Sequence, residues 1–308
     1  MKRVIVGAFS VFLIGFMLFC PEEAVKGAAD GLLVSANVIL PTLSVFLICS
    51  NILINIGFSR ILKKPFSRLM GPVFGIGGAG ALAFSLGVVS GYPVGAICTA
   101  NLYKNGDITK NEAHRLLGFT NNSGPLFIIG SVGAVMLKSK EAGYLLWGVH
   151  ILSSVATGII LKSFKREKTN RINEELDIVS LRLTDAVCEG VKSALMSVLN
   201  ISAYTVLFSV FLSSLKHFLG NSAILSVIFG VVEMTNGVNL ICQTSSIFGD
   251  WLLCILSFIL GFGGLSVSLQ VANAIKETDL SLKVYFMGKI MHAVLAFLFM
   301  FVLTRAVL

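Results

Sequence analysis

The sequence predicts an all-α polytopic membrane protein made of two inverted repeats with re-entrant or broken helices, about seven spans and two re-entrant hairpins. The first reason is composition: 55% of the 308 residues are hydrophobic and 13% are charged, whereas soluble domains carry about 25% charged residues. The second is the alternation of long apolar runs with short basic loops. The third is a pair of glycine-broken apolar blocks that recurs in the two halves of the chain.

Seven apolar runs are the expected spans: 4–19, 34–56, 116–137, 143–161, 190–215, 252–274 and 284–304. Most are long enough for a hydrocarbon core of about 30 Å. The first run follows Lys2 and Arg3, but no small-residue cleavage site comes after it, so we expect an uncleaved span rather than a signal peptide. Residues 73–102 and 223–241 are apolar but broken by Gly and polar residues. Such breaks suit re-entrant hairpins, because irregular backbone at membrane depth must be buried or line a cavity.

The basic residues support this layout. With a cytoplasmic N-terminus, 17 Lys and Arg residues lie on inside segments and 5 on outside segments, as the positive-inside rule requires. Run 34–56 then crosses inward and run 190–215 outward. The repeats are therefore inverted, an architecture that lets one site face either side of the membrane.

The repeats share one offset. The offset that aligns Gly87-Val88-Val89 with Gly230-Val231-Val232 also aligns Ser123 with Ser266. We expect residues 1–33 to form the first span and an outer loop, 34–161 the first repeat, 162–183 a cytoplasmic linker, and 184–308 the second repeat.

The breaks of the first repeat offer an anion site. Ser90-Gly91-Tyr92-Pro93 can end one half-helix and let the next begin after Pro93, whose fixed φ suits a first turn. Asn121, Asn122 and Ser123 precede Gly124-Pro125 in the same way. Free N–H groups at helix starts attract anions, and two such starts suit a dianionic dicarboxylate. The alternative is that these side chains only cap their own broken backbone. The expected substrate contacts are Ser90, Gly91, Tyr92, Asn121, Asn122 and Ser123.

In the second repeat, Glu233 is the one acidic residue inside an apolar run, and such residues are functional candidates. It either binds a coupling H⁺ or Na⁺, or pairs with Lys192 or Lys289. Lys289 shares a helix face with His292, and one of the two could meet a substrate carboxylate, but we expect Lys289 to reach the membrane interface instead. Further polar lining is expected from Thr235, Asn236, Asn239, Ser266, Ser268 and Gln270. Because the last three cannot share one helix face, an unwound stretch should follow Gly263-Gly264.

Several classes of site and function are disfavoured. The six cysteines show no C-x-x-C spacing and resemble core residues, while His114, His150 and His217 are expected in loops or at span ends. We therefore expect no metal and no cofactor. Nucleic acid is excluded as a partner because the basic residues lie in loops between spans. There is no H-E-x-x-H, no G-x-S-x-G and no pair of intramembrane acids, so we do not expect an enzyme.

The chain resembles a known family. SGYPVGA at 90–96, NGDITKNEAHRLL at 105–117 and FTNNSGPLFIIG at 119–130 are similar to sporulation integral membrane proteins of the YlbJ type. These belong to a broader group with the nucleoside-recognition, or Gate, domain, so both repeats would be Gate-like. The second half matches more loosely, chiefly at EMTNG, 233–237.

The resemblance implies a function. A YlbJ-type protein would be a secondary carrier or facilitator for a small organic anion, dipicolinate, imported towards the forespore across its outer membrane. A nucleoside or other small-solute carrier is the alternative, and a non-transporting scaffold or sensor in spore formation is an alternative of another class. The expected partners are the anion and the lipid bilayer, with a homo-oligomer or other sporulation membrane proteins left open.

Overall fold

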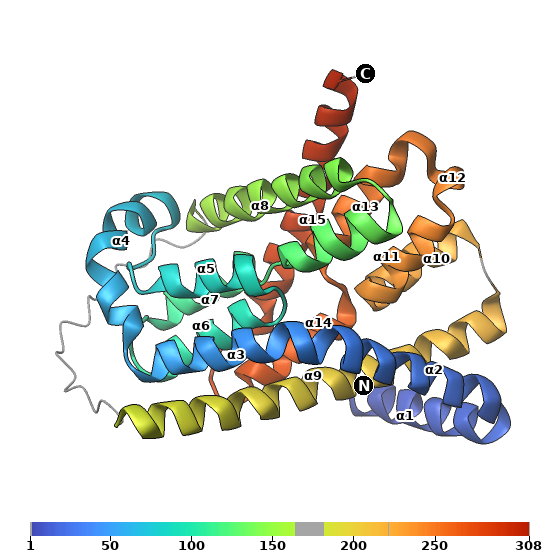
Figure 1. The fold of residues 1–308 in the computed structure, drawn as a ribbon, viewed down its shortest axis with the longest axis horizontal. Coiled ribbons are helices and arrows are strands. Elements are labelled where there is room, and N and C mark those ends of the chain that lie inside the picture. Colours follow the sequence, from blue (N-terminus) through green and yellow to red (C-terminus); the bar gives the residue numbers. More distant parts are fainter. Residues whose placement is uncertain (1, 164–181, 221, 308) are drawn as a thin grey trace.

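The computed structural model describes residues 2–163, 182–220 and 222–307, and all regular elements in these ranges are helical. The first half contains α1 (Lys2–Phe19), α2 (Pro21–Val34), the π-helical turn η1 (Ser35–Ile39), α3 (Leu40–Asn55), α4 (Phe58–Phe74), α5 (Gly80–Ser90), α6 (Val94–Lys104), α7 (Lys110–Phe119), the π-helix η2 (Leu126–Met136) and α8 (Lys140–Ser163). The second half contains α9 (Leu183–Leu219), α10 (Ala223–Val232), α11 (Met234–Gln243), α12 (Ser245–Phe248), the 3₁₀ turn η3 (Gly249–Trp251), α13 (Leu252–Phe262), α14 (Gly264–Ile275) and α15 (Leu282–Val307) (Figure 1). The all-α class is confirmed, and most of the expected linker 162–183 lies outside the described residues.

By length and composition, four segments can cross a membrane: Lys140–Ser163, Leu183–Leu219, Ser245–Ile275 and Leu282–Ala306. The number rises to six if each of two bent pairs counts as one span. The pairs are Arg3–Phe19 with Pro21–Asn37, bent by 113°, and Leu43–Asn55 with Phe58–Phe74, bent by 86°. The protein is therefore an integral membrane protein with four to six apolar spans. The expected count of about seven included 116–137, which the structure divides into α7, a break and η2.

The offset seen in the sequence also relates the helices. The shift that carries Gly87 to Gly230 also carries the starts of α5, α7 and α8 onto those of α10, α13 and α15 to within one residue. Each repeat thus contains a helical hairpin (α5–α6 or α10–α11), a broken helix (α7–η2 or α13–α14) and a closing helix (α8 or α15). The two hairpins approach the middle of the molecule from opposite sides (Figure 1).

The repeats are inverted, as the direction of two equivalent helices shows. The same shift carries α3 onto the first part of α9, and the two helices run antiparallel. The Asn55 amide donates to the Ala186 carbonyl at 3.2 Å, whereas Ile52, earlier in α3, packs against Gly190, later in α9: a Cβ on Gly190 would lie 2.8 Å from the Ile52 side chain. Equivalent helices of opposite direction require repeats of opposite orientation.

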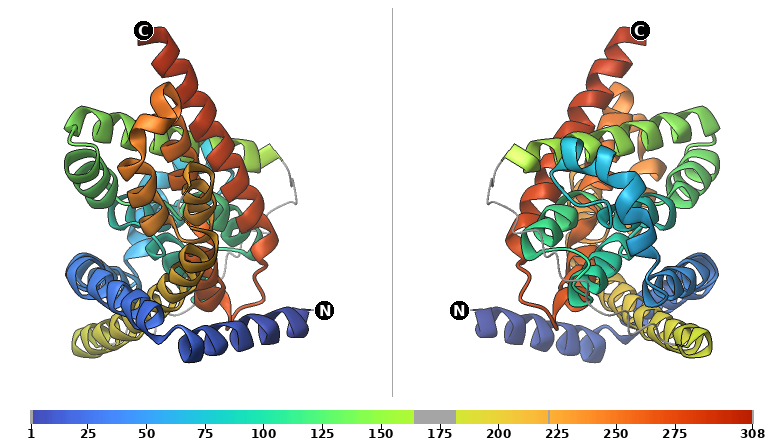
Figure 2. Two further views of the ribbon diagram at one scale, coloured as in Figure 1. Left: turned by 90° about the vertical axis from the view of Figure 1, so that its right-hand side faces the viewer. Right: turned by 90° about the vertical axis from the view of Figure 1, so that its left-hand side faces the viewer.

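Residues 21–34 differ from the expected outer loop, because they form α2. Pro21 starts this helix, and Glu22 and Glu23 lie in its first turn, where the helix dipole favours acidic residues. Gly27 and Gly31 lie one turn apart and let α2 approach α9 closely. α1 carries an exposed apolar surface and extends sideways from the bundle (Figure 2).

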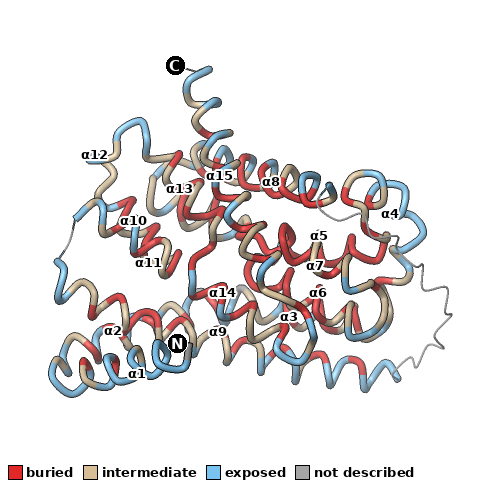
Figure 3. Tube along the Cα trace, turned by 180° about the vertical axis from the view of Figure 1, so that it is seen from behind, coloured by how far each residue is buried: buried red, intermediate tan, exposed pale blue. Residues whose placement is uncertain are grey.

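The core lies where the hairpins and the broken helices meet. Buried residues concentrate in α5, α6, α7, α13 and α14, while the outer helices α1, α4 and α9 are exposed along much of their length (Figure 3). The breaks in the helices are therefore packed within protein, which satisfies the condition for irregular backbone inside a membrane.

Candidate functional site

The tip of the first hairpin lies against the break between α7 and η2. α5 and α6 both pass the Thr120 carbonyl so closely that a Cβ on Gly87 would lie 1.9 Å, and one on Gly95 2.1 Å, from its oxygen. At the tip, a Cβ on Gly91 would lie 2.9 Å from the Gly124 nitrogen. Gly91 has a φ of 91°, a left-handed conformation that favours glycine. The first hairpin is thereby fixed against residues 120–125.

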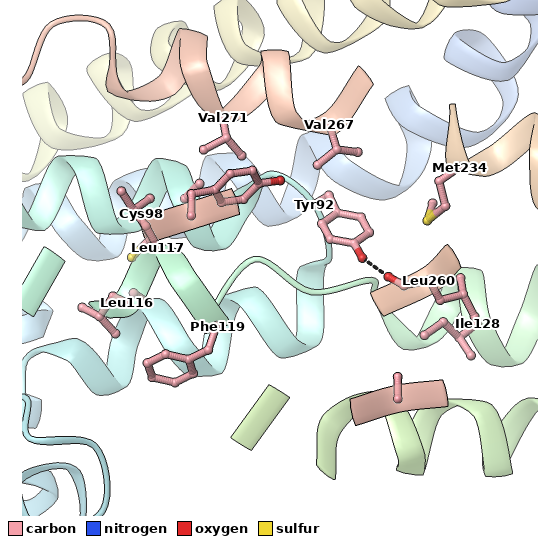
Figure 4. Packing of buried hydrophobic residues seen from close by; sticks show 14 of the residues in the cluster. Tyr92, Cys98, Leu116, Leu117, Phe119, Ile128, Met234, Leu260, Val267 and Val271 are labelled. Atoms are coloured by element: carbon pink, nitrogen blue, oxygen red, sulfur yellow. Dashed lines mark hydrogen bonds between the residues drawn. The ribbon is translucent and has the colours of Figure 1, made fainter. Parts of the chain in front are cut away.

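The tip of the second hairpin lies against the break between α13 and α14, and Tyr92 connects the two regions. A Cβ on Gly264 would lie 3.0 Å from the Met234 nitrogen, and a Cβ on Gly263 would lie 3.1 Å from the Tyr92 ring. The Tyr92 hydroxyl donates a hydrogen bond to the Leu260 carbonyl (Figure 4). Both hairpin tips therefore meet at one break of the second repeat.

Helix α15 carries a row of buried polar residues that faces the region where the two hairpin tips meet. Tyr285, Lys289 and His292 follow one another at four and three residues, so they share one helix face, and all three are at most 1% exposed. The Lys289 ammonium donates to the Asn121 carbonyl at 3.0 Å and lies 5.0 Å from the centroid of the Tyr92 ring. The expectation that Lys289 reaches the interface is wrong, because neighbouring helices enclose it on every side.

Lys289 has no acidic partner within the described chain, where its polar contacts are the Asn121 carbonyl and the face of the Tyr92 ring. A buried ammonium normally requires a counter-charge, because the effective desolvation penalty is several kcal/mol. The surroundings of Lys289 are therefore electrostatically incomplete.

Several polar atoms near Lys289 also lack hydrogen-bond partners in the described structure. The Asn121 side chain is unpaired at both its nitrogen and its oxygen, and the Tyr285 hydroxyl, close to Asn121 and Ser268, makes no hydrogen bond of ordinary geometry. We define the central polar cluster as these residues and their buried neighbours: Ser90, Asn121, Asn122, Ser123, Tyr285 and Lys289. A buried polar group left unpaired costs about 1–3 kcal/mol, so the cluster is suited to a ligand with several acceptor atoms.

Asn122 uses only one of its two polar side-chain atoms for capping. Its side-chain nitrogen donates to the Phe119 carbonyl at 3.0 Å and so closes the end of α7. Its side-chain oxygen is unpaired. Capping thus accounts for one atom of Asn122, and for neither polar side-chain atom of Asn121.

Two histidines lie behind the break. His150 was expected in a loop or at a span end, but it lies in the interior of α8 and is buried. Its ring lies 4.5 Å from the ring of His292, centroid to centroid. The Ser123 N–H donates to His150 Nε2 at 2.9 Å, and His292 Nε2 lies 2.9 Å from the His150 carbonyl oxygen. Sequence reasoning missed His150 and Tyr285; the signal for Tyr285 was its four-residue spacing from Lys289.

Glu233 is buried and caps a helix. Its carboxylate accepts hydrogen bonds from the Thr235 N–H at 3.1 Å and the Asn236 N–H at 2.8 Å, at the start of α11. The proposed ion pairs are absent from the described structure: Lys192 pairs with Glu189 at 3.7 Å on the surface, and Lys289 contacts the Asn121 carbonyl. The pairing alternative for Glu233 is therefore wrong, and its role in coupling stays a prediction.

The other second-repeat residues are arranged differently from the expectation. Ser266, Ser268 and Gln270 are buried within α14, which is regular; the expected unwound stretch after the glycines is wrong, because the break is confined to Gly263 and Gly264, with φ of 83° and 85°. The helix buries more than one of its faces, so three polar residues need not share a side.

Three predicted contacts on α11 are only half-buried: Thr235, Asn236 and Asn239. The Asn236 amide nitrogen lies 3.4 Å from the Ser209 hydroxyl, and the Asn239 carbonyl group accepts from Gln243 at 3.4 Å. The structure thus joins the first-repeat residues to α15, rather than to the polar face of α11.

Two ion pairs lie at the base of the first hairpin, away from the central polar cluster. Lys104 pairs with Glu277 at 2.7 Å, and Lys110 pairs with Asp279 at 2.6 Å. Tyr103 donates to Asp279 at 2.8 Å. The Lys110 ammonium, together with the Tyr103 hydroxyl, lowers the pKa of the exposed Asp279 carboxyl below its ordinary value. These contacts connect the hairpin of the first repeat to the loop before α15.

No set of three or more His, Cys, Asp and Glu side chains able to hold a metal occurs among the described residues. The cysteines of the described chain are free thiols. The chemistry available at the centre is accordingly that of hydrogen bonding, one ammonium group and two imidazoles.

Comparison with known proteins gives one informative relative. The chain is 29% identical to the sporulation integral membrane protein YlbJ of Bacillus subtilis (strain 168), over an alignment of 344 residues that covers 99% of this chain and 83% of that protein. No protein-family model matches the chain. No solved structure matches it either.

Proposed function

Because the chain is a YlbJ-type integral membrane protein with a role in sporulation, we propose that it is a secondary carrier or facilitator for a small organic anion. Dipicolinate is the proposed substrate, moved towards the forespore across the outer forespore membrane, with the N-terminus of the carrier in the cytoplasm. The carrier works through its inverted repeats, which present the central polar cluster to either side of the membrane.

The observation that carries this proposal is the buried amino group of Lys289. The ammonium is buried, and no carboxylate of the described chain pairs with it. An intramembrane charge without a partner in the protein marks a ligand pathway. A carboxylate entering the cluster supplies the missing counter-charge, and charge-assisted hydrogen bonds of this kind are about twice as strong as neutral ones.

The cluster also suits a second negative group. The unpaired amide nitrogen of Asn121 and the hydroxyl groups of Tyr285, Ser90 and Ser123 can all donate hydrogen bonds. A dicarboxylate can therefore place one carboxylate at Lys289 and the other among these neutral donors. A neutral nucleoside could use the same donors but would leave the ammonium uncompensated, which favours the anion.

Lys289→Met tests the proposal. Methionine keeps the length of the side chain and removes its charge and its donors. Losing one hydrogen bond to a charged group costs about 1.5–3 kcal/mol, so the affinity for dipicolinate should fall about ten- to a hundredfold. Calorimetric titration of purified protein with dipicolinate, a simple dicarboxylate and a nucleoside measures this change, and uptake into proteoliposomes shows whether the bound compound is carried.

Lys192→Met is the matched control, because Lys192 is also within a span but is exposed and pairs with Glu189. It should bind and transport like the wild-type protein. Equal affinity of Lys289→Met and wild type for the anion would refute the role of the ammonium. Binding of nucleoside in place of the anion would favour the nucleoside carrier, and binding without uptake by the wild-type protein would favour a sensor.

A further inference from the structure

The two buried histidines form a hydrogen-bonded connection between the central polar cluster and the closing helices of both repeats. Ser123 belongs to the break of the first repeat, His150 to α8 and His292 to α15. The Ser123 N–H contacts His150 Nε2, and His292 Nε2 contacts the backbone carbonyl of His150. A change at the His150 ring therefore acts directly on the backbone of the site, and a change at the His292 ring acts on the backbone of His150.

The hydrogen bonds assign the protons of this pair. A backbone N–H can only donate, so His150 Nε2 accepts and carries no proton; the neutral ring then holds its proton on Nδ1. A carbonyl can only accept, so His292 Nε2 carries a proton, and the neutral ring has its lone pair on Nδ1. Both Nδ1 atoms are buried without a partner in the described structure.

Adding one proton to the pair has two outcomes. On His292 it occupies the free Nδ1 and leaves every hydrogen bond intact. On His150 it occupies Nε2, which can then no longer accept from Ser123. The second outcome releases the Ser123 N–H, and with it the break that carries Asn121 and Asn122.

The charged surroundings limit the pair to one proton. The Lys289 ammonium acts on both rings from α15. No carboxylate of the described chain acts on either ring from α7, η2, α13 or α4, the other elements packed against α8. Two imidazolium ions 4.5 Å apart beside an ammonium would repel one another. An anion that binds at Lys289 makes protonation of the histidine pair more favourable, because it neutralises the nearest positive charge.

We propose that His150 and His292 form a proton-binding site that couples H⁺ to substrate: the proton enters from the side where the anion binds, displaces the Ser123 N–H while it occupies His150 Nε2, and leaves on the other side with the anion. This inference rests on the carrier function proposed above. It assigns coupling to the histidine pair in place of Glu233, whose carboxylate is already occupied by two backbone N–H groups of α11.

The test uses His150→Gln and His292→Gln in the full-length protein. A glutamine amide can replace hydrogen bonds of the neutral ring but does not take up a proton at physiological pH. In proteoliposomes loaded with a pH-sensitive dye, the wild-type protein should acidify the lumen as dipicolinate enters. Both variants should still exchange labelled for unlabelled dipicolinate, while dipicolinate-driven acidification falls to the level of protein-free vesicles and the pH dependence of exchange flattens.

His217→Gln is the control. His217 lies near the end of α9, 3.5 Å from Glu23 and remote in sequence from the pair, and its replacement should leave acidification unchanged. If a variant does not fold, titration of the wild-type protein with dipicolinate in buffers of different ionisation enthalpy counts the protons taken up on binding. About one proton per anion is expected for a pair that shares a single proton.

The outcomes separate this inference from the function on which it rests. Dipicolinate uptake with undiminished acidification in both variants overturns the histidine site and leaves the carrier in place. Zero proton uptake on binding does the same. Folded wild-type protein that neither binds nor exchanges dipicolinate overturns both.

Discussion

The packing of the first hairpin on the Thr120 carbonyl makes Gly87→Ala an informative substitution. The added methyl group would lie 1.9 Å from that oxygen, whereas ordinary contacts begin at 3.4 Å. The obstacle is backbone, and the oxygen is also enclosed by Gly95 on the opposite arm, where a Cβ would lie 2.1 Å away. Neither arm can relieve the clash by changing a rotamer, so the hairpin must move away from the break.

The expected magnitude combines two opposing effects. Overpacking a well-packed interior costs about 1–3 kcal/mol, or more when backbone must shift. Replacing glycine by alanine inside a helix stabilises the folded state by up to about 1 kcal/mol. The strain dominates, because the clash exceeds what small adjustments absorb, and we expect a net loss of about 1–3 kcal/mol.

The assay is the midpoint of thermal unfolding of purified protein in detergent, followed by size-exclusion chromatography of heated samples. The midpoint should fall by about 2–4 °C for each kcal/mol lost. Gly148→Ala is the matched control: Gly148 lies in the middle of α8, and its Cβ would meet nothing within 4 Å, so its midpoint should stay equal or rise slightly. A Gly87→Ala midpoint at or above that of the wild type would refute the packing described for the hairpin.

Two further predictions concern Glu233 and Asp279. Glu233→Ala removes the acceptor for two N–H groups of α11. The substitution should lower the free energy of unfolding by about 0.5–2 kcal/mol, measured by the same unfolding midpoint, and leave the pH dependence of dipicolinate uptake as in the wild type. Loss of that pH dependence would assign coupling to Glu233 instead of the histidine pair. Because Lys110 lowers the pKa of Asp279 in the folded protein, the ionised carboxyl stabilises the fold at neutral pH, and this contribution is lost as the pH falls through the lowered pKa. The midpoint difference between wild type and Asp279→Asn should therefore be present at pH 7, begin to shrink near the ordinary aspartate pKa of about 4, and vanish only below the lowered pKa of the folded protein; a difference of undiminished size in strong acid would contradict the ionic role of Asp279.

The breaks in the helices were predictable because the residues that cause them are local. Gly91 has the left-handed φ that glycine tolerates, and Gly263 and Gly264 end α13 and open α14 in the same way. The offset between the repeats follows from these breaks, since each occurs at an equivalent place. The inverted orientation followed from the expected re-entrant hairpins, supported by the loop charges, because Lys and Arg residues are retained on the cytoplasmic side.

Helix α2 was not predicted, because its acidic residues and Lys26 resemble a surface loop. The signal that could have revealed it is the pair Gly27 and Gly31, four residues apart, which permits close helix contact. Such a pair has meaning only when its partner helix is known. The contact residues on α9, Val206 and Ser213, belong to the other half of the chain.

The candidate site was only partly predictable for the same reason. Asn121 was identified from its position before Gly124-Pro125, a local pattern. Lys289 was identified as ionisable, but its depth depends on a contact with a residue 168 positions earlier, and sequence periodicity contains no such information. His150 was missed because one histidine in an apolar run is uninformative until its neighbour, His292, is known.

The two inverted repeats have the same order of helices, but they carry different side chains at the position of Lys289. The offset that relates α8 to α15 places Lys289 opposite Leu146. Both side chains are buried, yet one is an ammonium and the other a hydrocarbon. If the proposed substrate is a diacid with two identical ends, those ends meet non-identical surroundings, and its two carboxylates become distinguishable when it binds. Because the two ends of such a diacid are identical, turning it end over end would give the same complex, with one carboxylate at Lys289 and the other against neutral groups.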